Sequence, residues 1–71
     1  MDEKDRDEDR DDLEALVDKY RMSEVLEMLE EIADLKADRD ADMNNPAREQ
    51  SWEMLSEKIE QASSDAKELG L

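Results

Sequence analysis

Cysteine, histidine and phenylalanine are absent from this chain of 71 residues, which has only one glycine, one proline, one tyrosine and one tryptophan. Without Cys and His, the chain can form neither disulfides nor a zinc site of the Cys/His type. A single glycine leaves no Gly-rich loop for phosphate binding, and the serines have no histidine to activate them as nucleophiles. We therefore expect a protein that is not an enzyme and that holds no cofactor.

Long apolar runs are also missing. No segment approaches the length of about 20 apolar residues that crosses a bilayer. Residues 2–12 are all charged, where a secretory signal would need an apolar stretch. These absences lead us to expect no membrane association and, by default, a cytoplasmic location.

The charge is strongly of one sign, with 24 acidic against 10 basic residues and a net charge of −14. Such a chain repels the phosphates of nucleic acids and the surface of anionic membranes. It is attracted to basic protein surfaces, with fast and salt-sensitive association. Acidity of this degree is also compatible with a role in solubility alone, or with adaptation to a salt-rich cytoplasm, against which the lysines argue.

Residues 1–12 are charged apart from Met1, so we expect a disordered acidic tail, followed by a helical domain over residues 13–71. An apolar stripe at helical spacing begins at Leu13 and extends to Tyr20. A second stripe begins near Ser23 and extends to about residue 41. Nothing between them forbids one continuous helix, so one helix and two helices both remain open.

The clearest break in the chain is Asp-Met-Asn-Asn-Pro at residues 42–46. Asn and Asp favour turns, while Pro46 suits the first position of a helix that Asn45 would cap. A last helix then carries Trp52 and further apolar residues at steps of three and four. Gly70 is well placed to end it in a left-handed conformation.

These patterns predict an all-α fold, an antiparallel helical hairpin of two long helices with a short extra helix at its N-terminus as an alternative. A chain this small usually needs stabilisation beyond its own core, from disulfides, a metal or oligomerisation. Only oligomerisation remains here, so we expect a homodimer that forms a four-helix bundle. We favour the core over a partner contact for the lone tryptophan. The residues expected in the core or the self-association seam are Leu13, Leu16, Tyr20, Val25, Leu29, Ile32, Trp52, Leu55 and Ile59.

Acidic residues form rows on the expected second helix. Carboxylates on a rigid rod can imitate the phosphates of DNA and occupy the basic channel of a nucleic-acid-binding protein. An ordinary solvated helix face is the competing interpretation. The candidate partner-binding residues are Glu24, Glu27, Glu30, Glu31, Asp34 and Asp38.

A calcium loop is a weaker hypothesis. Positions 1, 3, 5 and 12 of an EF-hand loop supply oxygen ligands. Met43 stands where that loop needs glycine, and Pro46 is unusual at its ninth position, so a solvated acidic turn is the preferred interpretation. The four residues at ligand positions are Asp38, Asp40, Asp42 and Glu49.

Part of the chain resembles a class of small helical proteins of uncharacterised role encoded by phages and prophages. The resemblance covers about residues 16–62 and depends on the segments 16–20 and 22–27, the dipeptides Ile32-Ala33 and Lys36-Ala37, and Trp52. It implies an accessory protein of a mobile element, a setting in which acidic proteins often inhibit host machinery. It implies no site residues.

These observations lead to three hypotheses. The first is a non-enzymatic acidic module, an inhibitor or DNA mimic of phage type, that binds the basic surface of a nucleic-acid-handling protein. The second is a self-assembling accessory protein whose acidity gives only solubility. The third is a weak calcium-binding hairpin.

Overall fold

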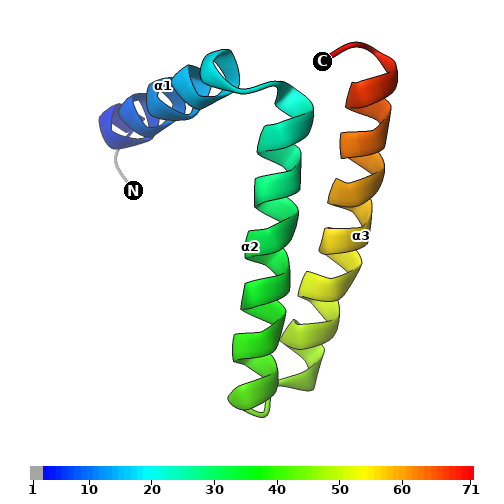
Figure 1. Ribbon diagram of the computed structural model, residues 1–71. Coiled ribbons are helices and arrows are strands. Elements are labelled where there is room, and N and C mark those ends of the chain that lie inside the picture. The colour runs from blue at the N-terminus through cyan, green and yellow to red at the C-terminus, as the bar shows by residue number, and fades with distance from the viewer. Residues whose placement is uncertain (1–2) are drawn as a thin grey trace.

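Three α-helices make up the computed structural model, which describes residues 3–71 (Figure 1). They are α1 (Glu3–Lys19), α2 (Met22–Asp42) and α3 (Pro46–Glu68). The all-α prediction is confirmed. The stretch from residue 13 to 41 is not one helix, because the chain leaves the helical conformation at Tyr20 and Arg21.

Helices α2 and α3 run in opposite directions, side by side, and are joined by a short turn (Figure 1). Two serine hydroxyls of α3 donate hydrogen bonds to α2. Ser63 Oγ donates to the main-chain oxygen of Ser23 at 3.1 Å, and Ser56 Oγ donates to Asp34 Oδ1 at 2.7 Å. Both serines can therefore be buried, since a buried hydroxyl that has a hydrogen-bond partner avoids the cost of desolvation.

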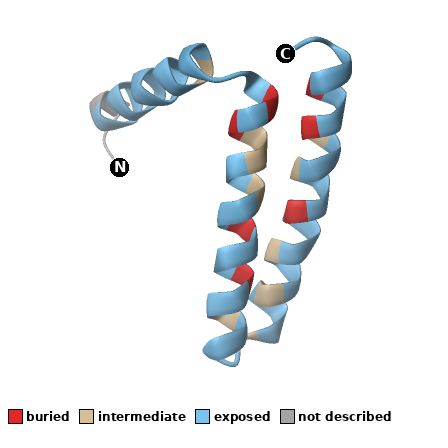
Figure 2. Cartoon of the chain, viewed as in Figure 1, coloured by how far each residue is buried: buried red, intermediate tan, exposed pale blue. Residues whose placement is uncertain are grey.

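Small residues fill the seam between α2 and α3, as the buried positions on the facing sides of the two helices show (Figure 2). Apart from Val25, which lies on another side of α2, they recur at spacings that place them on one face of each helix. Small side chains there allow the helix axes to approach closely. Ala33 is the most buried, with 1% of its surface exposed. The buried residues are Ser23, Val25, Ala33, Ala37, Ser56, Ser63 and Ala66.

Few of the residues predicted for the core or the self-association seam are buried within a single chain. Val25 is buried as expected, and Trp52 and Ile59 are half-buried. Ile32 and Leu55, in contrast, remain 49% and 43% exposed. The exposed members of the predicted set are Leu13, Leu16, Tyr20, Leu29, Ile32 and Leu55. The large apolar side chains lie beside the seam, because the alanines and serines occupy the positions where the helices meet.

Both helices of the pair end in the same way. At the end of α2, Asn44 is left-handed at φ 57° and Asn45 N donates to Asp40 O at 2.8 Å. At the end of α3, Gly70 is left-handed at φ 77° and Leu71 N donates to Ala66 O at 2.8 Å. These are Schellman motifs, which satisfy the last carbonyls of a helix. The turn predicted at residues 42–46 and the helix end at Gly70 agree with the structure.

Helix α1 corrects the prediction of a disordered tail, because the chain is helical from Glu3 onward. Residues 1–2 of that tail lie outside the described part. Oppositely charged residues three apart support each other on a helix, as Arg10 and Asp7 do at 3.5 Å. A helix that has formed at Leu13–Lys19 also propagates upstream more readily than a new one starts.

Helix α1 projects away from the α2–α3 pair and meets it only near the start of α2 (Figure 1). The molecule is consequently open, with a radius of gyration of 14.2 Å against about 11 Å for a compact chain of this length. Its accessible surface is 5876 Å², whereas a compact monomer of 8.3 kDa would expose about 4,600 Å².

Candidate functional site

The acidic residues of α2 border a groove on one side of the α2–α3 pair. Glu27, Glu30 and Glu31 line it from α2, and Glu60 and Lys67 line it from α3 together with Ser63 and Ser64. Its volume is about 330 Å³. We refer to the predicted residues Glu24, Glu27, Glu30, Glu31, Asp34 and Asp38, with Glu60 of α3 added, as the acidic face.

Two members of the acidic face do not lie on the outside of the helix as predicted. Glu27 and Glu30 are half-buried beside the seam. Partial burial, followed by the nearby charges of Glu60 and Asp34, raises the pKa of Glu30 above its usual value. These crowded carboxylates therefore favour a cation, or a proton, in the groove.

Among the described residues that line this groove, Lys67 is the only base. Its Nζ lies 2.5 Å from Glu27 Oε1, and the hydrogen bond to Glu27 raises the pKa of Lys67. Both side chains are about half exposed, at 59% and 46%. An ammonium group of the chain itself thus occupies one end of the groove.

The other predicted members of the acidic face are exposed. Asp34 accepts the hydrogen bond from Ser56, and Glu24 accepts one from the main-chain nitrogen of Arg21 at the start of α2. Glu31 precedes Asp34 by three residues and Asp38 follows it by four, so both lie on the same side of the helix as Asp34. Five of the six predicted residues therefore lie along one side of α2, and Glu30 is directed toward the seam.

The contribution of α3 to this side was missed from the sequence. Glu60 lines the groove, and Glu53 and Glu57 precede it on the same face of α3 at steps of four and three. This spacing was available in the sequence. It predicted a site only once the structure placed these residues across the groove from the acidic residues of α2.

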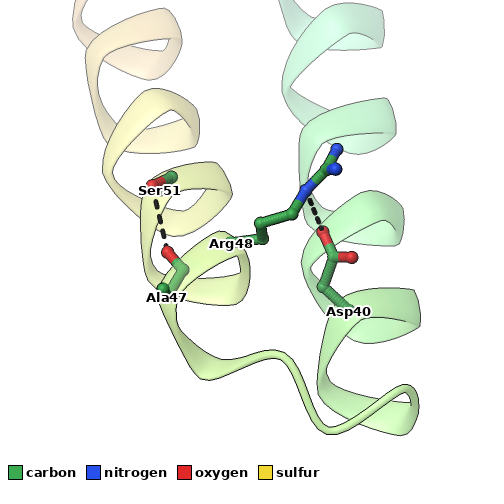
Figure 3. Close-up of polar contacts among 4 residues, drawn as sticks. All are labelled: Asp40, Ala47, Arg48 and Ser51. Carbon is green, nitrogen blue, oxygen red and sulfur yellow. Dashed lines mark hydrogen bonds and ion pairs between the residues drawn. The ribbon is translucent and has the colours of Figure 1, made fainter.

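The opposite side of the pair is different in character. Arg48 Nε lies 3.7 Å from Asp40 Oδ2, which joins α3 to α2 there (Figure 3). Helical spacing places Leu29, Ile32 and Lys36 on the same side of α2 as Asp40.

On α3, Leu55 follows Arg48 by two helical turns and borders a shallow pocket with Arg48, Ser51 and Trp52. Lys58 borders the neighbouring depression with Leu55. The basic–apolar face is thus made of Leu29, Ile32, Lys36, Arg48, Leu55 and Lys58.

The structure does not bring the four candidate calcium ligands together as a binding loop. Asp38, Asp40 and Asp42 belong to the last turns of α2 and Glu49 to the first turn of α3, so no loop wraps around an ion. Asp40 is engaged with Arg48. Within residues 3–71 no group of three or more acidic side chains is arranged to hold a metal.

Comparison with known proteins yields no relative: no family model, no curated protein and no solved structure matches the chain.

None of the helices described over residues 3–71 combines the length and the apolar character that crossing a bilayer requires.

Proposed function

We propose that this protein is a non-enzymatic, acidic protein-binding module that occupies a basic surface of a nucleic-acid-handling protein, as an inhibitor or DNA mimic of phage type would. In this proposal the α2–α3 pair is a helical hairpin that presents the acidic face to the partner. The chain acts as a homodimer, and two hairpins form a helical bundle.

The separation of charge on the α2–α3 pair carries the proposal. Carboxylates gather along the acidic face, whereas Lys36, Arg48 and Lys58 lie on the basic–apolar face. A charge that served solubility alone would have no reason to gather on one side. Separation of this kind creates a directional field that steers a basic partner to one side of the molecule.

The spacing of the carboxylates also fits a phosphate-binding surface. Residues at steps of three and four, such as Glu27, Glu31 and Asp34, repeat every 4.5 to 6 Å, roughly, along a helix. Phosphates follow one another every 3.4 Å, roughly, along the axis of one DNA strand. Lysines and arginines spaced to contact alternate phosphates would therefore find carboxylates within reach.

A second candidate is a self-assembling accessory protein. It is supported by the large apolar side chains that a single chain leaves exposed, among them Ile32 and Leu55. In that case the acidic face keeps the assemblies apart and in solution and has no partner of its own.

The two candidates are separated by a pull-down of the tagged full chain from nuclease-treated lysate of the source organism, with short duplex DNA added as a competitor. The same pull-down is repeated with two variants that remove equal amounts of negative charge from different places. One neutralises the outer part of the acidic face (Glu24→Gln, Glu31→Gln and Asp38→Asn), and the other neutralises three acidic residues of α1 (Asp5→Asn, Asp9→Asn and Asp12→Asn).

A mimic should retain a basic nucleic-acid-binding protein that elutes with rising salt and with duplex DNA, because both compete for the same cationic groups. The acidic-face variant should lose this protein, while the α1 variant should keep it. Recovery of the chain alone, at every salt concentration, would contradict the proposal and leave self-assembly as the function.

A further inference from the structure

Helix α1 carries an apolar stripe that its own chain leaves uncovered. Leu13 and Leu16 are 46% and 43% exposed, Tyr20 is exposed as well, and only Val17 is half-buried. Apart from the junction with α2, the helix lies away from the rest of the molecule (Figure 1). An amphipathic helix gains most of its stability from packing that stripe against another surface.

The basic–apolar face is uncovered too. Ile32 and Leu55 are large and exposed there, and no large side chain is fully buried anywhere in the described residues. The face is also where Lys36, Arg48 and Lys58 gather, in a chain whose net charge is −14.

The two uncovered surfaces complement each other in charge. Nine acidic and four basic residues make up the charges of α1, so it is a negative helix with an apolar stripe. The basic–apolar face has three bases and, at its edge, Asp40 already paired with Arg48. Opposite charges around an apolar contact fix orientation and speed association.

They also match in length. The apolar stripe runs from Leu13 in α1 to Tyr20 just after the helix, and the α2 part of the face runs from Leu29 to Lys36, so each spans seven residue steps. Seven steps along an α-helix correspond to about 10 Å. The stripe can therefore cover the α2 part of the face along its length.

We propose that two copies of this chain exchange their α1 helices, so that the stripe of each α1 packs on the basic–apolar face of the other copy. The inference deepens the proposed homodimer and leaves both acidic faces open to a partner. The exchange is symmetric, as expected for two identical chains with an isologous contact.

The exposed area is sufficient for such a dimer. The chain has about 1,300 Å² more accessible surface than a compact monomer of its mass, and a stable interface buries about 800 Å² on each partner. In the structure α1 projects away from the α2–α3 pair beyond the short linker of Tyr20 and Arg21 (Figure 1), so its stripe is open to a second copy.

Single cysteines test the exchange directly, because the chain has none of its own. A tagged Leu16→Cys chain is unfolded and refolded with an untagged Ile32→Cys chain and then mildly oxidised. Each chain has one thiol, so any disulfide joins two copies. The control replaces the second chain by Glu31→Cys, whose thiol lies on the acidic face next to the tested position.

We expect the Leu16–Ile32 cross-link to exceed the Leu16–Glu31 cross-link by roughly tenfold, which corresponds to about 1.4 kcal/mol in effective proximity. Equal yields, or no cross-linked pair, would overturn the exchange. Predominant Ile32–Ile32 disulfides would overturn it too, in favour of a dimer whose faces meet directly. None of these results affects binding of a basic partner by the acidic face.

A second measurement does not depend on disulfide geometry. Leu16→Asp should convert the dimer into a monomer with its helical circular dichroism retained, as sedimentation would show. Leu69→Asp introduces the same change at a position that is 74% exposed and outside both surfaces, so it should leave the dimer intact. A dimer that tolerates Leu16→Asp would contradict the exchange.

Discussion

The two sides of the α2–α3 pair are built on the same two helices and differ in almost every other respect. One side has a groove crowded with Glu27, Glu30, Glu31 and Glu60. The other side has exposed leucine and isoleucine with lysine and arginine around them. A seam of alanine and serine separates them. The contrast supports our proposal of two binding surfaces of different chemistry on one small protein, one for a basic partner and one for a second copy.

The largest effect should come from the seam on which both sides depend. Ala33 is 1% exposed, so Ala33→Leu forces the helices apart and should lower the free energy of unfolding by about 1–3 kcal/mol. For a chain of this size each kcal/mol lowers Tm by about 4–8 °C. Thermal melts followed by circular dichroism measure it, with Ala41→Leu at an exposed position as the control. Similar melts for both variants would show that the seam is not tightly packed.

Charge reversals on the two sides of the pair should differ in their effect on dimerisation. Lys58→Glu places a negative charge on the basic–apolar face, where the negative α1 of a second copy is proposed to pack. We expect the dimer dissociation constant to rise by roughly three- to tenfold, measured by sedimentation.

Glu57→Lys reverses the charge at the residue before Lys58, which lies on the acidic side. It should leave dimerisation unchanged while weakening the binding of the basic partner. If both variants weakened the dimer equally, the two sides would not be distinct surfaces.

A smaller effect is expected from one hydrogen bond of the seam. Ser63→Ala removes the buried donor to the main-chain oxygen of Ser23 and should lower the free energy of unfolding by about 1 kcal/mol. Chemical denaturation measures the change. Ser64→Ala, at the adjacent exposed position, should change it by less than about 0.5 kcal/mol. A larger loss at Ser64 would place the seam elsewhere.

The smallest effect concerns the pH dependence of the acidic side. The raised pKa of Glu30 means that the folded protein takes up a proton at a higher pH than the unfolded chain does. Glu30 therefore contributes stability at low pH that is lost as the pH rises through its folded-state pKa.

Glu30→Gln should raise Tm slightly at pH 7 and reduce the rise in Tm on acidification from pH 7 toward the usual pKa of a glutamate. Melts at a series of pH values test this. An unchanged pH profile would mean that Glu30 is not crowded in the folded state.

Much of the fold was predictable because turns and helix ends depend on local chemistry. The sequence Asn44-Asn45-Pro46 cannot continue a helix and readily starts another, and Gly70 adopts the left-handed conformation that ends one. The row of carboxylates on α2 was predictable too, since spacing of three and four residues places side chains on one face wherever the helix lies.

The core was not predictable, because periodicity identifies a stripe but not the surface that the stripe meets. Leu29 and Ile32 form the stronger apolar stripe, yet Ala33 and Ala37 face the other helix. A serine such as Ser63 reads as polar in a sequence and becomes a core residue only when a main-chain oxygen of another helix accepts its hydrogen bond. Residues 3–12 read as disordered by composition, and their helix depends on the apolar turns at Leu13–Lys19 that continue it.

The central claim, that the side opposite the acidic face binds a second copy, is tested most directly by sedimentation equilibrium of the unmodified chain at salt concentrations of about 0.1 and 1 M. We predict twice the chain mass of 8.3 kDa at both, because the contact is apolar at its centre and salt screens the repulsion between two chains of net charge −14. A single-chain mass at both salt concentrations would contradict it.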